Sequence, residues 1–251
     1  MSAIKSFFTT ILYKPLFNVL IFLVWLIPGH YVGFAIIILT VLIRLILLPS
    51  SANSIKAQKK LKDLQPEIDK IREKYKTDQQ AQAKATMDFY KENKINPFSS
   101  CLPLLIQLPI LIILYYVFRS GLTTARFGDL LYGFTPHPNA INTMFFGIDL
   151  AQPSIYLAVI TGALQFWQTK QMAPVEPPKT GEGNQNAMAS ALNKQMLYIM
   201  PVFTVFIAAK LPAALPLYWS ITTIFMVIQQ AVLLRDKSVD KKGVSVSVRN
   251  R

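Results

Sequence analysis

The sequence is poor in the side chains that disulfides, metal centres and most enzyme active sites require. Among 251 residues there is one cysteine, Cys101, and there are two histidines, His30 and His137. One cysteine excludes an internal disulfide and a redox pair, and neither histidine has a second metal ligand close to it in the sequence. No glycine-rich loop has the spacing of a phosphate-binding motif. We therefore expect no metal, no cofactor and no enzymatic activity.

Acidic residues are also few, and none lies in the long apolar stretches. The chain has 13 Asp and Glu against 26 Lys and Arg, a net charge of +13, and 52% hydrophobic residues. A membrane-spanning helix needs about 20 mostly apolar residues to cross the ~30 Å hydrocarbon core of a bilayer. The composition predicts an all-α, polytopic membrane protein with five transmembrane helices, at about 30–49, 100–118, 153–170, 194–209 and 212–234.

The apolar run near the start of the chain is shorter than these five spans. Residues 14–27 begin with a lysine and are followed by a Pro-Gly pair, without the small residues of a signal-peptide cleavage site. Because about 13 apolar residues cross a bilayer poorly, we predict an N-terminal helix lying in the membrane interface, with Phe17, Phe22 and Trp25 in the lipid. A signal anchor that spans the bilayer is the alternative.

Lysine and arginine are distributed very unevenly between the segments that join the spans. Of the 26 basic residues, 20 fall in segments 55–94 and 170–194 or after residue 234, and five fall on the opposite side. Cytoplasmic segments of membrane proteins carry the excess of basic residues. The sequence therefore predicts a protein of the bacterial plasma (inner) membrane, with its N-terminus outside and its C-terminus in the cytoplasm.

The polar segment 55–94 has helical periodicity. Apolar residues recur there at steps of three and four, at Leu61, Leu64, Ile68, Ile71 and Tyr75. Pro66 is expected to start or kink a helix, and Thr77 or Asp78 is a candidate N-cap of a second helix. We predict an antiparallel cytoplasmic helical hairpin. It is either a solvated linker or a surface that binds anionic lipid headgroups, ribosomal RNA or a targeting factor.

These features divide the chain into five parts. Because AAKLPAA alone joins the fourth and fifth spans, we expect those two helices to form a tight hairpin. The parts are an N-terminal extracytoplasmic or interfacial helix at 1–29, the first transmembrane helix at 30–54, the cytoplasmic hairpin at 55–96, transmembrane helices two to five with their loops at 97–234, and a basic cytoplasmic tail at 235–251.

Arg44 carries the most information about function. It lies in the run LTVLIRLILLP, inside the first predicted span. An arginine at the centre of a span costs about 2.5–3.5 kcal/mol on insertion scales, and no predicted span carries a carboxylate to pair with it. We therefore expect Arg44 to face water, polar side chains or an acidic group of a visiting partner. The alternative is that it extends to the cytoplasmic lipid surface.

Polar residues of other spans are candidates to line a hydrated groove around Arg44. In the third span, steps of four and three place the candidates on one helical face. The alternative is that they hold the helices together by hydrogen bonds. The candidate groove residues besides Arg44 are Gln107, Thr161, Gln165, Gln168, Trp219, Thr222 and Thr223.

Four long motifs, taken together, are similar to those of one known family. They are RLILLPSSANSIKAQKKLKDLQPEIDKIREKY at 44–75, FYKENKINPFSSCLPLLIQLPILIILYYVFR at 89–119, LQFWQTKQ at 164–171 and MLYIMPVFTVFIAAKLPAALPLYWSITTIFMVIQQ at 196–230. From about residue 14 to 235 the chain resembles the YidC/Oxa/Alb family of membrane-protein insertases, in a short form without the large extracytoplasmic domain. Ala214, where family members often have glycine, and the additional Pro216 depart from the pattern.

The resemblance implies a five-helix core with a groove that is closed to the outside and open to the cytoplasm and to lipid. The groove arginine of the family maps onto Arg44, its polar partners map onto Gln107, Gln165 and Trp219, and its cytoplasmic hairpin maps onto 55–94. The implied function is an insertase and chaperone that takes nascent membrane-protein clients into the lipid bilayer. The implied further partners are the ribosome, a signal-recognition-type targeting factor and a Sec-type translocon, with a monomer as the active form.

Two other functions remain open for a membrane protein with a buried charge. A small-solute transporter usually has internal repeats or paired ionisable groups in its spans, and neither is found in this sequence. A membrane-embedded protease needs a nucleophile with its base, or metal ligands, within the spans, whereas His30 and His137 lie at the outer edges of the apolar segments. The transporter is the stronger of these alternatives.

Overall fold

The computed structural model describes residues 9–96, 102–119, 130–136, 138, 140–172 and 195–235. In this part the chain is mostly helical, with one antiparallel pair of two-residue strands. The elements in chain order are η1 (Thr9–Tyr13), α2 (Lys14–Leu26), α3 (Val32–Ile46), α4 (Leu48–Asp63), α5 (Gln65–Lys74), α6 (Gln79–Glu92), α7 (Leu102–Arg119), β1 (Met144–Phe145), β2 (Ile148–Asp149), α8 (Ile155–Met172), η4 (Gln195–Ile199), α10 (Met200–Ala208) and α11 (Ala214–Arg235).

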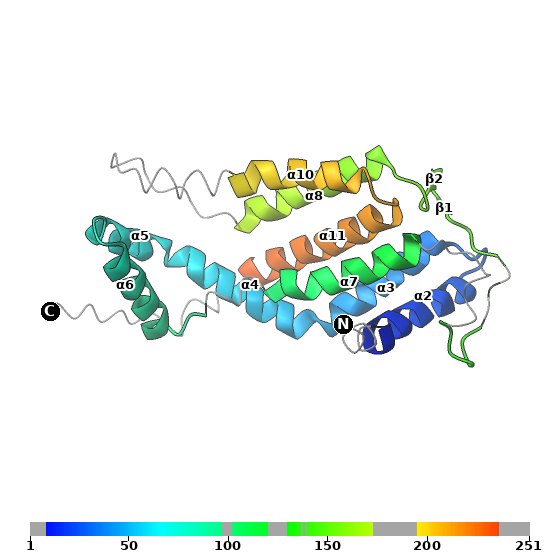
Figure 1. Cartoon of the computed structure of the whole chain (residues 1–251), viewed down its shortest axis with the longest axis horizontal. Coiled ribbons are helices and arrows are strands. Elements are labelled where there is room, and N and C mark those ends of the chain that lie inside the picture. Colours follow the sequence, from blue (N-terminus) through cyan, green and yellow to red (C-terminus); the bar gives the residue numbers. More distant parts are fainter. Residues whose placement is uncertain are drawn as a thin grey trace.

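The long helices form one bundle in which α11 is central (Figure 1). α11 packs against α3, α4, α7 and α8, while α2 packs on the other side of α3. α8 lies between α10 and α11, because it contacts both of them. The connection between α10 and α11 is short, as expected. The two helices nevertheless lie on either side of α8 and do not form a tightly packed pair.

A glycine sets the close approach of α8 and α10. A Cβ atom on Gly162 would lie 2.3 Å from Cγ2 of Val205 and 3.1 Å from the carbonyl oxygen of Pro201. Both distances are shorter than a relaxed van der Waals contact. The absence of a side chain at residue 162 therefore lets the two helix backbones approach closely, as small residues do in membrane helix pairs.

The first predicted span is bent close to its end. Helix α3 stops at Ile46, and α4 begins at Leu48 after a bend of 67°. Pro49 occupies the first turn of α4, where its missing N–H and its ring prevent an unbroken helix across this point. The apolar helix is therefore shorter than 30–49, and the helix that follows it is continuous from the bundle into the polar segment.

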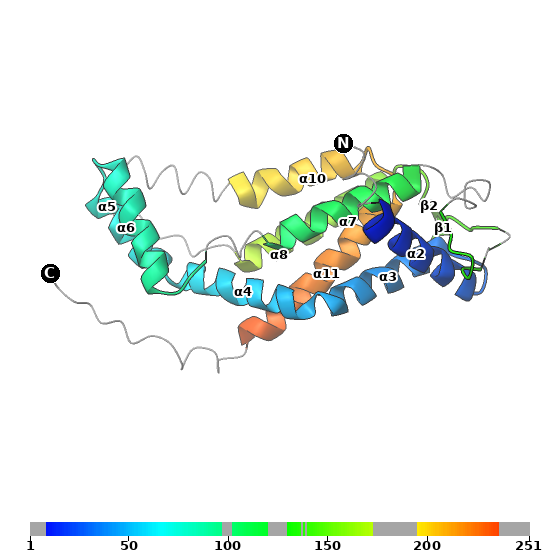
Figure 2. The same cartoon turned by 60° about the horizontal axis from the view of Figure 1, so that its bottom comes forward.

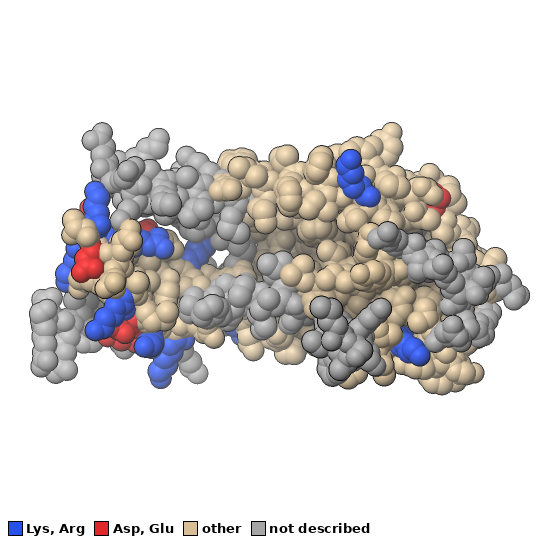
Figure 3. Space-filling view, in the orientation of Figure 1, with Lys and Arg blue, Asp and Glu red and all other residues tan. Residues whose placement is uncertain are grey.

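Helices α5 and α6 lie together at the end of the molecule to which α4 leads (Figures 1 and 2). Leu64 separates α4 from α5, Pro66 lies in the first turn of α5, and Ile68 is buried. The Asp78 carboxylate accepts hydrogen bonds from the backbone N–H groups of Gln80 and Ala81, both at 3.0 Å, which confirms Asp78 as the N-cap of α6. Lys and Arg gather over these helices (Figure 3). We call this the α5–α6 end.

Backbone hydrogen bonds close the opposite end of the bundle, which we call the loop end. The N–H of Val32 donates to the carbonyl of Asn142, and the N–H of Asn142 donates to that of His30. The N–H of Ala214 similarly donates to the carbonyl of Leu150. Segment 140–154 therefore ties the start of α3 to the start of α11.

Two of the described helices are long and apolar enough to cross a bilayer, namely Thr9–Leu26 and Ala214–Leu234. The bent pair α3 and α4 makes a third if it is counted as one span, whereas Gln107–Phe118 and Leu197–Ala208 are apolar but shorter. The N-terminal helix is longer than the predicted apolar run, because η1 continues into α2. The described residues thus support a protein with several membrane helices, and the five-span arrangement stays a prediction.

Candidate functional site

Arg44 lies in the last turn of α3 and is buried, with 7% of its surface exposed. It comes one helical turn after Thr40, which is also buried and whose hydroxyl donates to the carbonyl of Ile36. The guanidinium turns into the bundle, where its Nη2 donates a hydrogen bond of 2.6 Å to Oε1 of Gln107. The side chain is therefore bonded between helices and does not extend to the lipid surface.

Gln107 connects Arg44 to a third helix. Its Nε2 donates a hydrogen bond of 3.0 Å to the hydroxyl oxygen of Tyr218, and Tyr218 is 2% exposed. The three side chains come from α3, α7 and α11, so they form a continuous hydrogen-bonded chain across the bundle. We call Arg44, Gln107 and Tyr218 the polar triad.

The sequence predicted two members of the polar triad and missed the third. It singled out Trp219, but successive residues of a helix point about 100° apart. The side chain of Tyr218 accordingly lies within the bundle, while that of Trp219 is half-buried. Because both residues are aromatic and adjacent, the sequence alone did not indicate which of Tyr218 and Trp219 faces Arg44.

The positive charge of Arg44 has no carboxylate partner among the described residues. Its triad partners are a neutral amide and a phenol, whereas Arg72–Asp69 and Lys91–Asp88 are salt bridges within α5 and α6. A guanidinium has five N–H donors, and one of them bonds Gln107. The triad thus orients the charge without neutralising it.

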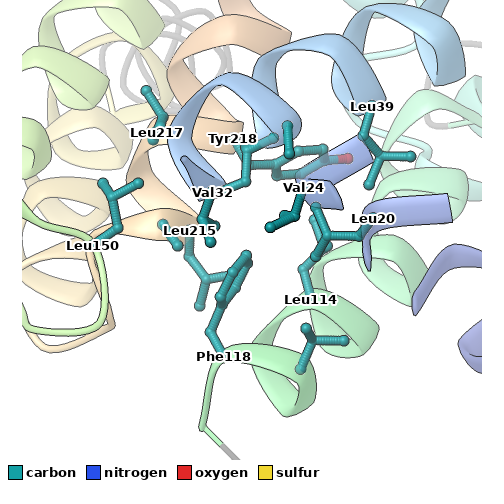
Figure 4. Close-up of a cluster of buried hydrophobic side chains, with 14 of the residues drawn as sticks. Leu20, Val24, Val32, Leu39, Leu114, Phe118, Leu150, Leu215, Leu217 and Tyr218 are labelled. Atoms are coloured by element: carbon teal, nitrogen blue, oxygen red, sulfur yellow. The ribbon is translucent and has the colours of Figure 1, made fainter. Parts of the chain in front are cut away.

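An apolar core fills the bundle between the polar triad and the loop end. Figure 4 shows side chains of this core from α2, α3, α7, α11 and the segment after β2, with the ring of Tyr218 among them. Tyr218 therefore lies where the polar triad meets this apolar core. The labelled members are Leu20, Val24, Val32, Leu39, Leu114, Phe118, Leu150, Leu215, Leu217 and Tyr218.

Beyond the triad, toward the α5–α6 end, buried side chains are more polar. Ser51 on α4 donates a hydrogen bond of 2.8 Å to Oε1 of Gln229 on α11, and Nε2 of Gln229 lies 3.4 Å from the carbonyl of Leu48. Ser54 and Gln230 are 2% and 1% exposed. Buried hydroxyl and amide groups therefore lie along α4 and the second half of α11 on this side of the triad, whereas the apolar core lies toward the loop end.

The other predicted groove residues lie in contacts between helices or within one helix. The hydroxyl of Thr161 is 3.0 Å from the carbonyl of Pro216 and 2.8 Å from the hydroxyl of Ser220, so it connects α8 to α11. Oε1 of Gln165 accepts a hydrogen bond of 2.9 Å from Thr204, which connects α8 to α10.

Of the remaining candidates, Gln168 lies on α8, and Trp219, Thr222 and Thr223 lie on α11. Nε2 of Gln168 is 3.5 Å from the sulfur of Met226 on α11. The hydroxyl of Thr223 donates to the backbone carbonyl of Trp219, and Thr222 is buried. The structure thus brings Gln107 to Arg44, and whether the other candidates line a groove stays a prediction.

His30 takes no part in this site. Nδ1 of His30 is 3.1 Å from the carbonyl of Val24 at the loop end, and His137 lies outside the described residues. In the described part of the chain, no group of His, Cys, Asp and Glu is arranged to hold a metal ion.

Comparison with known proteins relates this arrangement to a family. A family model described as "60Kd inner membrane protein" matches residues 25–241. The "Membrane protein insertase YidC" of Clostridium tetani is 40% identical over 194 residues, which cover 76% of each chain. The protein of the same name from Fusobacterium nucleatum is 36% identical over 205 residues, which cover 81% of this chain and 86% of that one.

A longer relative matches over a smaller share of its own length. The "Membrane protein insertase YidC" of Francisella tularensis subsp. novicida is 34% identical over 204 residues, which cover 81% of this chain and 32% of that protein. The family model covers most of the chain, including all three members of the polar triad. The chain therefore belongs to the 60Kd inner membrane protein family, which it shares with these YidC insertases.

Proposed function

We propose that this protein is a membrane-protein insertase that receives client segments from the cytoplasm at Arg44 and releases them into the bilayer. The observation that carries the proposal is the polar triad: a buried guanidinium, bonded to a neutral amide, with no carboxylate partner among the described residues. The names of the relatives support the same function.

The charge of Arg44 gives the groove its chemical selectivity. A client segment that enters the membrane with an acidic or polar tail loses hydration, which is the main cost of crossing. A fixed guanidinium offsets part of this cost, because a charge pair at about 4 Å is worth ~4 kcal/mol at an effective dielectric constant of 20. Gln107 holds the guanidinium in place and leaves its net charge available to the client.

The polarity of the interior gives the entry its direction. Hydroxyl and amide groups line the interior from Arg44 toward the α5–α6 end, and the apolar core lies on the other side. A hydrophilic stretch therefore enters from the α5–α6 end and stops at the level of Tyr218. The client's apolar segment then moves sideways into lipid, where burial of each CH₂ group contributes about 0.8 kcal/mol.

The distribution of charge supports placing the α5–α6 end in the cytoplasm. Segment 55–94 carries 11 of the 26 basic residues, and basic segments stay on the cytoplasmic side. Helices α5 and α6 then form the predicted cytoplasmic hairpin. The proposed topology has five spans, with the N-terminus outside and the C-terminus in the cytoplasm. The ribosome, a targeting factor and a Sec-type translocon are further proposed partners.

The contacts of Asn18 favour an interfacial position for α2 over a signal anchor. Asn18 is 4% exposed. Its Nδ2 donates a hydrogen bond of 2.9 Å to the carbonyl of Leu130. Its Oδ1 accepts hydrogen bonds of 2.7 Å from the N–H of Tyr132 and from the hydroxyl of Thr135. An irregular, proline-containing loop is thus bonded to the middle of α2. Such a loop is unstable in the lipid interior, so the middle of α2 lies near the membrane surface.

Reconstituted insertion of a single-span client with an acidic tail tests the role of Arg44. We expect Arg44→Ala to slow insertion about tenfold or more, since ~1.4 kcal/mol corresponds to a factor of ten. Arg44→Glu should slow it further, because repulsion replaces attraction. Arg44→Lys should stay within a few-fold of the wild type, because the positive charge matters more than the forked geometry.

Two controls make this test specific. Arg72→Ala removes an arginine of α5 that is paired with Asp69, and it should leave insertion unchanged. A client whose tail has Asn and Gln in place of its acids should be insensitive to Arg44→Ala. Equal insertion of the acidic client by wild type, Arg44→Ala and Arg44→Glu would contradict the electrostatic role. Solute flux through the same vesicles, abolished by Arg44→Ala, would favour the transporter instead.

A further inference from the structure

The strand pair β1–β2 at the loop end has an unusual turn. Met144 pairs with Asp149 and Phe145 pairs with Ile148, so Phe146 and Gly147 are the two turn residues. Both have positive φ, 47° and 80°, as in a type I′ turn. Such turns strongly prefer Asn-Gly or Asp-Gly, because Asn and Asp tolerate the left-handed conformation and bulky side chains do not. Phe146 therefore occupies a position that its own backbone preference disfavours.

Packing within the protein does not account for Phe146 either. Its side chain is 85% exposed, and the ring contacts described for it are with Phe34 and Phe145, at centroid distances of 6.4 and 4.7 Å. A residue that is strained and also exposed gains little from the fold. Strain of this kind is retained where the side chain has a function.

Phe145 fixes the β1–β2 hairpin on α3, so the position of Phe146 is defined. A Cβ atom on Gly33 would lie 2.2 Å from Cδ2 of Phe145, which shows that the ring occupies the space above this glycine. Phe145 also makes an edge-to-face contact with Phe34 at 5.3 Å. The hairpin is thus seated on the first turn of α3 by one aromatic ring and presents the next one outward.

Phe146 extends a lipid-facing stripe of α3. Phe34, Ile38, Leu42 and Leu45 are 40–51% exposed, and their spacing of four, four and three places them on one helical face. In a member of an inner membrane protein family, an exposed apolar helix face of this kind lies against lipid. Phe146 contacts Phe34 at the end of this stripe nearest the loop end.

The length of α3 places this end of the stripe within reach of the lipid. Its 15 residues extend about 22 Å at ~1.5 Å per residue, which is less than the ~30 Å hydrocarbon core. The chain bends by 67° at the other end of α3, and apolar groups beside the start of α3 extend its lipid contact at the loop end. Phe146 is the group that continues the stripe there, and aromatic residues are enriched where hydrocarbon meets water.

We propose that the β1–β2 hairpin is a membrane-interface anchor, with Phe146 immersed at the boundary between lipid headgroups and acyl chains. The ligand is the lipid surface itself. The anchor holds the loop end of α3 at a defined depth, and it does not depend on the role of Arg44. A strained Phe-Gly turn is retained because relieving it with asparagine would remove the lipid contact.

Spin labels measure the immersion directly. With Cys101→Ser as background, a nitroxide is attached at Met144→Cys, beside the turn, in vesicles of phosphatidylethanolamine and phosphatidylglycerol. Collision rates are measured with oxygen, which concentrates in lipid, and with a water-soluble nickel chelate. Labels at Ile38→Cys and Thr77→Cys supply the lipid and water references, since Ile38 belongs to the α3 stripe and Thr77 is exposed in the turn between α5 and α6.

Phe146→Asn separates anchoring from folding. We expect the label at residue 144 to resemble Ile38 in the native hairpin, and the Phe146→Asn change to raise its nickel collision rate several-fold toward that of Thr77. The same change should preserve or raise the melting temperature in detergent, because asparagine suits the turn. Water-like collision rates at residue 144 with Phe146 present, or rates that Phe146→Asn leaves unchanged, would overturn the proposal.

Discussion

At the scale of single residues, the central feature is an arginine whose partners are all neutral among the described residues. Gln107 uses both ends of its amide, accepting from Arg44 and donating to Tyr218. A hydrogen bond to a charged group contributes about 1.5–3 kcal/mol, against about 1 kcal/mol for a neutral pair. Gln107 therefore contributes more to the stability of the site than its half-buried position suggests.

Gln107→Leu should destabilise the protein by about 2–4 kcal/mol, because it leaves a buried guanidinium and a buried phenol without their partner. Thermal unfolding in detergent, followed by tryptophan fluorescence, measures the change. Gln168→Leu is the matched control, since the one hydrogen bond of that half-buried amide within the described residues is a contact of 3.5 Å to a methionine sulfur. Equal melting temperatures for the two variants would show that the triad contributes no stability.

At the scale of elements, the bundle depends on close helix contacts that small and polar residues provide. Gly162 lets α8 approach α10, Thr161 bonds α8 to α11, and Ser51 bonds α4 to α11 just after the bend. The bend redirects the chain by 67°, and the Ser51–Gln229 hydrogen bond holds α4 in its new direction. These contacts keep α3, and with it Arg44, at a fixed position in the bundle.

Gly162→Ala should separate α8 from α10 and cost about 1–3 kcal/mol, as overpacking does in dense interiors. Val205→Ala should restore part of the loss in the double variant, because it removes the methyl group that the new Cβ would meet at 2.3 Å. The exposed neighbour Ala163 supplies the control, and Ala163→Leu should have little effect. Thermal unfolding in detergent of the wild type, the two single variants, the double variant and the control decides whether the two positions are coupled.

At the scale of the whole molecule, charge and polarity change in the same direction along the bundle. The α5–α6 end carries most of the charged side chains on the face shown in Figure 3, and the apolar core lies toward the loop end. This asymmetry suits the proposed function, in which polar client segments bind from one side of the membrane. Under that proposal, the orientation in the membrane determines the direction in which clients enter.

Labelling with a membrane-impermeant maleimide tests that orientation. In a Cys101→Ser background, Ala151→Cys at the loop end should react from outside intact cells, because it is exposed next to β2. Thr77→Cys in the turn between α5 and α6 should react only after the membrane is permeabilised. The reverse pattern would contradict the proposed topology and the proposed entry of clients from the cytoplasm.

Much of this molecule was predictable because hydrophobic periodicity and charge asymmetry are local properties of the chain. The sequence indicated the membrane class, the family, Arg44 and Gln107, and it offered Asp78 as a helix cap. It did not indicate that α8 separates α10 from α11, because the packing partners of a helix that is apolar on most faces leave no periodic signal. The structure shows Thr161 and Gln165 bonded to neighbouring helices, and whether they also line a groove stays a prediction.

The sequence by itself determined that Arg44 lies within an apolar segment. It also determined that this cation has no acid to neutralise it in any predicted span. The tertiary structure decided which groups meet that cation. Tyr218 and Gln107 are 111 residues apart, and their approach depends on how three helices pack. The tertiary structure likewise placed Phe145 over Gly33 and left Phe146 exposed, because the contacts between a strand pair and a distant helix arise only when the chain has folded.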